Sequence, residues 1–338
     1  MARRSVDWLL AARMQANCLA RPVHEAGPGG VADVVRRTGG LQAQTWRGAA
    51  YAVRARSTAT TLADVTHAQV TERCVVRGWF VRGTLQLVAT EDAGPLLGLL
   101  GPKLIKDTER RYGELGLPER IRSQAADVLE QHLLAHGPCT RAELADVLVR
   151  AGLIPEPKGQ AVYALIRYAG LLGRLCYGPG DTWVAVTDWL GKPLVLDGDL
   201  EALARRYLAA YGPATPRDFA TWAGLSVPDA RSAIKAVATI SVEVEATDLY
   251  AVEDLPGSQD VRMLGEFDAY LLGYQNRFQE LPKSIFPGGG MLSPAVIRAG
   301  RAIGAWRHAD LSTDLFEPAD LTDELADLAR FGRTPTEA

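Results

Sequence analysis

An internal repeat is the feature that most constrains how this chain can fold. The segment 137–144 (GPCTRAEL) matches the segment 212–219 (GPATPRDF) at the same spacing of Gly-Pro, Thr and acid. In each copy a helical pattern stops at Gly-Pro, and a second helix begins at a Thr cap with an acid three residues later. In the first copy, Thr140 and Glu143 form the pattern of a capping box. The repeat therefore predicts a helix-turn-helix pair that is used twice.

Each copy is followed by a third amphipathic stretch and then by a short alternating run. After the first copy these are GQAVYALIRYAGLLGRL and LCYGPGDTWVAV; after the second they are SVPDARSAIKAVATI and SVEVEATDLYAVED, with a turn expected near Thr247 and Asp248. Helix, helix, helix and hairpin is the order of a winged helix. A weaker third copy near the N-terminus ends in the β-rich run VVRGWFVRGTLQLVAT.

We therefore expect an α+β chain of three tandem winged helix-turn-helix domains, followed by a C-terminal β-rich element with a hairpin. In that element, AVIRAGRAIGAW predicts two strands around Ala299 and Gly300. The expected boundaries are 1–115, 116–195 and 196–256 for the winged helices, 257–310 for the β-rich module, and 311–338 for a final helix and tail.

Composition excludes several classes of site. No run of about 18 apolar residues and no export signal is visible, so a cytoplasmic protein without a membrane partner is expected. The four cysteines and five histidines are scattered, so neither a metal site nor a disulfide is predicted. No Walker loop and no Gly-x-Ser-x-Gly elbow occurs, and no cofactor is expected.

Charge is distributed unevenly along the chain. The net charge is −3, but residues 1–90 hold twelve Arg and no Lys against five acids, whereas residues 310–338 hold eight acids and two Arg. A basic segment beside repeated winged helices favours a DNA partner, bound through its phosphates. At this point the chain could be an enzyme that acts on DNA or a non-catalytic winged-helix DNA-binding protein or transcription regulator.

Four segments carry a resemblance to a known family: GLQAQTWRGAAYAVRAR, VVRGWFVRGTLQLVATED, LGEFDAYLLGYQNR and SPAVIRAGRAIGAWR. Together they resemble the AlkZ/YcaQ family of bacterial winged-helix DNA glycosylases, in order over residues 5–310. The resemblance implies hydrolysis of the N-glycosidic bond of N7-alkylated purines in double-stranded DNA, and a hairpin that reaches toward the DNA. Our leading hypothesis adds the unhooking of interstrand crosslinks. It implies no cofactor, and we infer no obligate protein partner.

The resemblance also assigns catalytic residues. The family motif is Gln, an aliphatic residue, then Gln or Asp, and Gln42-Ala43-Gln44 has the Gln form, which is associated with self-resistance to DNA-alkylating natural products. An N7-alkylated base already carries a positive charge, so it leaves without a general acid. Two amide oxygens could then suffice to orient the attacking water. The alternative is that Gln42 and Gln44 are solvated surface residues, as a lone Gln-x-Gln usually is.

Further candidates for DNA contact are polar residues of the same four segments, together with Lys283, which precedes the last of them. The strand region departs from the family pattern at Gln86, where a His is expected. Asp268 and Arg277 could instead form a structural ion pair with each other, and the hairpin cations could belong to an ordinary exposed turn. The complete expected DNA-binding set is Arg56, Arg77, Arg82, Thr84, Gln86, Arg277, Lys283, Arg298 and Arg301.

Overall fold

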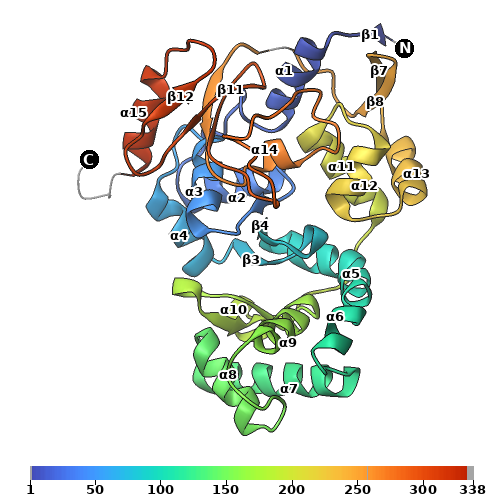
Figure 1. Ribbon diagram of the computed structural model, residues 1–338, viewed down its shortest axis with the longest axis vertical. Coiled ribbons are helices and arrows are strands. Elements are labelled where there is room, and N and C mark those ends of the chain that lie inside the picture. The colour runs from blue at the N-terminus through green and yellow to red at the C-terminus, as the bar shows by residue number, and fades with distance from the viewer. Residues whose placement is uncertain (1, 257, 333–338) are drawn as a thin grey trace. The chain divides into compact units, whose positions relative to one another are not determined.

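The computed structural model describes residues 2–256 and 258–332, which form two compact units (Figure 1). The discontinuous unit joins the residues up to Ala68 to those from Leu200 onward, and the central unit comprises Gln69–Asp199. Both units combine helices with antiparallel strand pairs, as expected for an α+β chain. In the described ranges, no helix has the length and apolar character needed to cross a membrane.

The discontinuous unit contains helices from both ends of the chain. They are α1 (Val6–Ala16), α2 (Gly27–Arg37), α3 (Trp46–Arg54), α11 (Leu200–Tyr211), α12 (Pro216–Ala223), α13 (Val227–Val237), α14 (Ala269–Leu272) and α15 (Thr322–Phe331), while α4 (Leu62–Val70) runs across the boundary into the central unit. Its strands are β1 (Ala2–Arg3), β2 (Leu41–Gln42), β7 (Ile240–Val244), β8 (Thr247–Ala251), β9 (Val261–Leu264), β10 (Ala295–Arg298), β11 (Arg301–Trp306) and β12 (Thr313–Leu315).

Two sheets organise this unit. The first sheet has the strand order β1-β7-β8. Its β7–β8 hairpin turns at Glu245 and Ala246, two residues before the expected turn. Both residues adopt the positive φ that a tight two-residue hairpin turn needs. The second has the order β12-β11-β10-β9 and covers a core that includes Trp306 and Leu328. Strand β12 lies within the segment 311–338, for which only a helix and a tail were expected.

The β10–β11 hairpin confirms the predicted strand pair. Arg298 and Arg301 face each other across a two-residue turn in which Ala299 and Gly300 have φ of 50° and 80°. A Cβ on Gly300 would lie 2.2 Å from the Leu10 carbonyl oxygen, so the turn lies directly against α1. One side of this turn is therefore packed against its own unit, while Ala299 stays half-exposed.

The central unit contains the other elements. Its helices are α5 (Thr90–Asp107), α6 (Glu109–Glu114), α7 (Glu119–His136), α8 (Arg141–Arg150), α9 (Gln160–Leu171) and α10 (Val186–Leu190), with 3-10 turns η1 (Val81–Gly83) and η2 (Pro179–Asp181). Strands β3 (Val75–Trp79), β4 (Leu85–Ala89), β5 (Leu175–Tyr177) and β6 (Trp183–Ala185) lie side by side in the order β4-β3-β5-β6. The β-rich run before residue 90 therefore shares a sheet with the hairpin that follows α9.

Both copies of the repeat fold as predicted at their caps. Thr140 and Glu143 form a complete capping box at the start of α8, and Thr215 and Asp218 form another at the start of α12. Each box satisfies two of the backbone N–H groups left unpaired at a helix start. The elements that follow are α9 with β5–β6 in one copy, and α13 with β7–β8 in the other.

Buried ion pairs account for part of the basic N-terminal segment. Arg54 is 1% exposed and pairs with Glu324 and Asp327 of α15, each at 3.0 Å. Arg13 is fully buried and lies 3.5 Å from Asp218. Acids from the C-terminal half thus neutralise part of the positive charge near the N-terminus within one unit, and this part is not available to bind a polyanion.

Candidate active site

The Gln42-Ala43-Gln44 motif links α2 to α3. Gly39 and Gly40, with φ of 66° and 105°, end α2 and turn the chain into β2, a conformation that glycine adopts without strain. Gln42 ends β2 and is 7% exposed, whereas Gln44 is exposed in the bend before α3. The motif is therefore a short connection between two helices and lies outside both of them.

Thr45 fixes the start of α3 directly after Gln44. Its hydroxyl accepts a hydrogen bond from the Gly48 N–H at 2.9 Å and donates one to Glu266 Oε1 at 2.8 Å. A Cβ on Gly48 would lie 2.9 Å from the Glu266 carbonyl oxygen, so glycine permits this close approach. The backbone beside Gln44 is thereby held against the segment that carries Glu266.

Glu266 is the centre of a small charged network. His308 Nε2 lies 2.5 Å from Glu266 Oε2, and Arg47 Nε lies 3.4 Å from Oε1. Burial by itself raises the pKa of Glu266, but the hydrogen bonds from His308 and Thr45 outweigh it and lower the pKa to about 2. The His308 ring lies edge-on to Tyr51, with 4.5 Å between ring centroids. Glu266 is therefore an ionised and well-positioned anchor for the start of α3.

The two glutamine amides are free to hold a water molecule. Within residues 2–256 and 258–332, neither side chain forms a hydrogen bond to another protein group. An amide oxygen accepts hydrogen bonds and an amide N–H₂ donates them, but neither transfers protons readily at neutral pH. The motif can thus orient a water molecule or a polar ligand, but it cannot serve as a strong base.

A cavity of about 820 Å³ lies next to this network in the same unit. It is lined by Arg47 from α3, by Ser293, and by the segment from Ala305 to Asp314, which includes His308. Neither glutamine lines it. Nowhere in the described ranges do three or more His, Cys, Asp or Glu side chains gather in a way that could hold a metal ion.

Comparison with known proteins decides the class of the enzyme. The model of the family described as DNA glycosylase AlkZ-like matches residues 35–331. The chain belongs to the AlkZ-like DNA glycosylase family. It is 29% identical over 314 residues, 82% of each chain, to an interstrand DNA cross-link repair glycosylase of Streptomyces sahachiroi. The solved structure of the Streptomyces sahachiroi DNA glycosylase AlkZ is similar with a TM-score of 0.75 and 25% identity, over 97% of each chain.

In this DNA glycosylase, Arg56 has a structural role that differs from the expected DNA contact. It is fully buried, and its guanidinium donates to both carboxylate oxygens of Asp268 at 2.8 and 2.9 Å and to Asn17. With every face of the guanidinium occupied, Arg56 cannot reach a phosphate. Asp268 therefore pairs with Arg56 and not with Arg277, whose Nε donates to the Leu271 carbonyl oxygen at 2.7 Å.

Four of the expected DNA contacts lie on the β3–β4 hairpin of the central unit. Arg77 is 5% exposed, pairs with Asp181 and lies over the Tyr177 ring. Gln86 is 3% exposed, and its Oε1 accepts a hydrogen bond from the Val81 N–H at 3.3 Å. The structure thus gives these two buried side chains internal partners. Arg82 and Thr84 are half-buried in the turn between the strands and keep partial access to solvent.

The remaining expected contacts lie in the C-terminal part of the discontinuous unit. Arg298 pairs with Glu317, and Arg301 pairs with Asp7 at 2.7 Å, so both hairpin cations have acidic partners. Arg277 is half-buried, and burial lowers its pKa. Lys283 is exposed in the loop before Gly288–Gly290. Lys283 therefore lies in an exposed loop of this region, while the β10–β11 turn packs against α1.

Sequence analysis did not single out Glu266 or His308. Glu266 lies only two residues before Asp268, within a segment that the family resemblance already uses. Nothing in the spacing indicates that it meets Thr45, because 221 positions separate the two residues. The sequence signal that could have identified Glu266 is its position as an acid in the same segment as Asp268.

Proposed function

We propose that this DNA glycosylase releases bulky N7-alkylated purines from double-stranded DNA and unhooks interstrand crosslinks, with Gln42 and Gln44 positioning the water. The observation that carries the proposal is the placement of this motif: two amides without partners among the described residues, directly before a helix start that Thr45 and Glu266 hold in place. The crosslink substrate is supported by the printed name of the Streptomyces sahachiroi relative.

The proposed chemistry needs no strong acid or base. The bond between C1′ and N9 breaks, and its electron pair neutralises the positive charge of the N7-alkylated base. A water molecule held by the amide oxygens of Gln42 and Gln44 forms the new bond to C1′, and its proton passes to solvent. Fixed geometry supplies much of the rate in such a reaction, because the water is already oriented when the cationic sugar develops.

The neutral motif also provides selectivity. An uncharged purine is a poor leaving group, and two amides cannot protonate it. Undamaged DNA therefore stays intact although it can bind. This selectivity suits an enzyme that protects the DNA of a cell making an alkylating natural product, acting in the cytoplasm without a metal or cofactor.

DNA binding is proposed to use three winged helices. The element order α7-α8-α9-β5-β6 supports one copy and α11-α12-α13-β7-β8 supports another, each with its capping box. In sequence order, α1 to α4 followed by β3–β4 gives the third. Of the expected contacts, Arg82, Thr84, Arg277 and Lys283 keep partial or full exposure and remain in the proposal, as do the hairpin cations Arg298 and Arg301, which are half-buried and paired with acids.

The experiment compares base release from three duplexes under single-turnover conditions. One carries N7-methylguanine, one carries a bulky N7-alkylguanine, and one carries a 7-deaza analogue of the bulky adduct, which has the same shape without the positive charge. We expect release of the bulky cationic adduct, slower release of the methyl base, and binding without release of the analogue. Release of the analogue at a similar rate would contradict the proposal, as would tight DNA binding with no release of either cationic base.

A further inference from the structure

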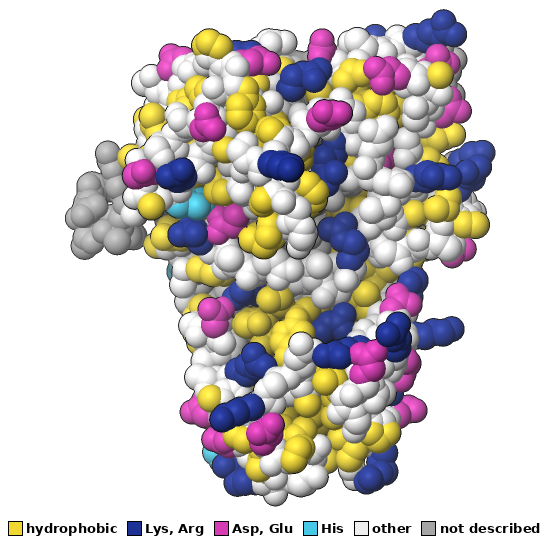
Figure 2. Space-filling model, in the orientation of Figure 1, with side chains coloured by type: hydrophobic (Ala, Val, Ile, Leu, Met, Phe, Trp, Pro, Cys, Tyr) yellow, Lys and Arg dark blue, Asp and Glu magenta, His cyan; other side chains and the backbone are white. Residues whose placement is uncertain are grey.

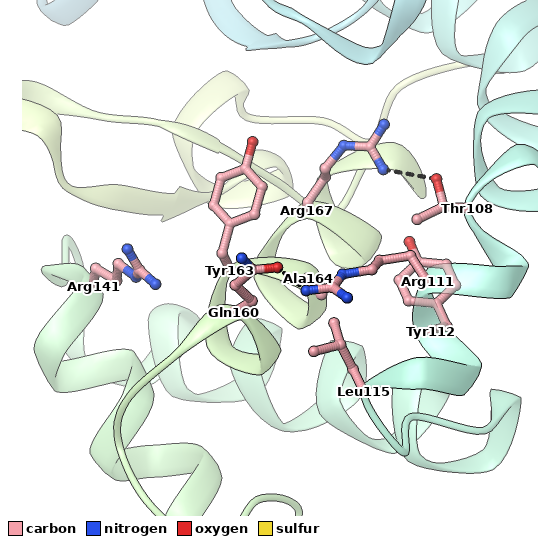
Figure 3. Close-up of a pocket in the computed structure, with 9 residues that line it drawn as sticks. All are labelled: Thr108, Arg111, Tyr112, Leu115, Arg141, Gln160, Tyr163, Ala164 and Arg167. Atoms are coloured by element: carbon pink, nitrogen blue, oxygen red, sulfur yellow. Dashed lines mark hydrogen bonds between the residues drawn. The ribbon is translucent and has the colours of Figure 1, made fainter.

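The central unit contains a second cavity that the glycosylase site does not use. It measures about 510 Å³ and lies between α6, the start of α8 and α9. Three guanidinium groups line it, those of Arg111, Arg141 and Arg167, together with Tyr163 (Figure 3). On the face drawn in Figure 2, dark blue Lys and Arg side chains gather beside yellow apolar ones in the lower part of the view.

The positive charge in this cavity is only partly neutralised. Arg111 pairs with Glu114 at 2.8 Å and also contacts Gln160. Arg141 donates to the Gly159 carbonyl oxygen at 2.9 Å, and Arg167 donates to the Thr108 hydroxyl at 3.2 Å. In the ranges that the structure describes, neither of the last two has a carboxylate partner. Guanidinium groups without carboxylate partners around one cavity favour the binding of an anion, and their planar fork matches phosphate oxygens.

A buried hydroxyl also lines the cavity. Tyr112 is 1% exposed, and Arg167 acts as a donor beside its oxygen, but the Tyr112 O–H has no acceptor among the described residues. Burial raises the pKa of Tyr112 against the opposing charge of Arg167, so the hydroxyl stays protonated and can donate. A buried donor without an acceptor costs free energy, and a bound anion would remove that cost.

The cavity lies along one face of α9. Gln160, Tyr163, Ala164 and Arg167 are spaced three or four residues apart and therefore share that face. In helix-turn-helix proteins the third helix of such a domain is the one presented to DNA. A Cβ on Gly83 would lie 2.2 Å from Arg167 Nη2, so Arg167 also touches the β3–β4 turn, in which Arg82 and Thr84 are expected to face DNA.

We propose that this cavity is a phosphate subsite for the DNA backbone, in which Arg141 and Arg167 contact phosphodiester oxygens of an undamaged part of the duplex. The ligand is recognised by its phosphate groups and not by its sequence or its lesion. This proposal depends on the proposed binding of double-stranded DNA but not on the catalytic role of Gln42 and Gln44, so the two proposals can fail independently.

The test measures how duplex affinity depends on salt. The dissociation constant of an undamaged, fluorescently labelled duplex is measured from about 50 to about 200 mM KCl for the wild type and for Arg141→Gln/Arg167→Gln. Because each phosphate contact contributes about 0.9 to the slope of log Kd against log salt, we expect the slope to fall by about 1.8 in the double variant. Arg141→Lys/Arg167→Lys keeps both charges and should retain the wild-type slope.

The matched control is Arg120→Gln/Arg150→Gln, which removes two exposed charges from α7 and α8 of the same unit. It should leave both the slope and the rate of base release unchanged. An equal slope in the control and in the Arg141/Arg167 variant would overturn the subsite. A second result would also overturn the subsite. If inorganic phosphate saturates the cavity while the variants leave the salt dependence of duplex binding unchanged, the cavity binds a free anion and not the DNA backbone.

Discussion

Replacement of Glu266 by Gln tests the network that holds the helix start directly after Gln44. In the wild type the carboxylate has a pKa of about 2 in place of 4.5, because the hydrogen bonds from His308 and Thr45 outweigh burial. A folded-state pKa below the unfolded value means that the ionised group stabilises the protein above pH 4.5. That contribution is lost as the pH falls toward 2.

The size of the effect follows from this difference in pKa. Each tenfold change in proton affinity is worth about 1.4 kcal/mol, so the ionised carboxylate contributes about 3 kcal/mol near pH 7 and about half of that near pH 3. Glu266 is 8% exposed, so solvent screens this contribution only weakly. The amide introduced by Glu266→Gln does not ionise, so the free energy of unfolding of that variant should lack the pH-dependent contribution of the Glu266 carboxylate.

The assay is urea unfolding of the wild type and of Glu266→Gln at several pH values between about 7 and about 3. Other carboxylates titrate in both proteins, so they cancel in the difference between the two free energies of unfolding. Glu253→Gln is the control, because Glu253 is an exposed carboxylate of the same unit, with its side chain 64% exposed. We also expect slower base release by Glu266→Gln at saturating enzyme, since the helix start beside Gln44 loses its anchor.

A difference in unfolding free energy that stays constant from neutral to acid pH would refute this reasoning. So would a Glu253→Gln protein that shows the same pH dependence as Glu266→Gln. In either case Glu266 would not be the strongly ionised anchor that the contacts with Thr45 and His308 indicate.

Two further substitutions test the packing that supports the site. Asp268→Asn removes the charge opposite the buried Arg56 and should lower the free energy of unfolding by about 3–5 kcal/mol, because it leaves an unpaired buried cation; a thermal midpoint equal to that of the wild type would argue against the pair. Gly300→Ala should cost about 2 kcal/mol or more, since the residue has φ of 80° and a Cβ would meet the Leu10 carbonyl oxygen. Ala299→Gly is its control and should be neutral or stabilising in the same unfolding assay, and equal losses in both variants would contradict the tight contact with α1.

Local features were predictable from the sequence. The capping boxes at Thr140 and Thr215 depend on residues three positions apart, and the β10–β11 hairpin depends on alternation around a two-residue turn. Such signals lie within a few residues of each other, so pattern and turn chemistry reveal them. The same holds for the order of helices and hairpins in the two repeat copies.

Contacts between distant segments were not predictable in this way. The basic N-terminal segment suggested a surface for DNA, but Arg13, Arg54 and Arg56 are buried against acids that lie about 200 or more positions away. The anchor that Glu266 provides for Thr45 depends on a similar separation. Composition gives the number of charged residues but does not show which of them are buried against each other. Only the tertiary structure shows those pairs.

Single-turnover base release from a duplex with a bulky N7-alkylguanine, at saturating enzyme, tests the central claim most directly. Gln42→Met and Gln44→Met keep the length of the side chain and remove its amide, and Gln131→Met changes an exposed glutamine of α7 as the control. We predict that each motif variant slows release by about 100-fold or more while duplex affinity stays near that of the wild type. Release at the wild-type rate by both motif variants would contradict the claim that these two amides position the attacking water.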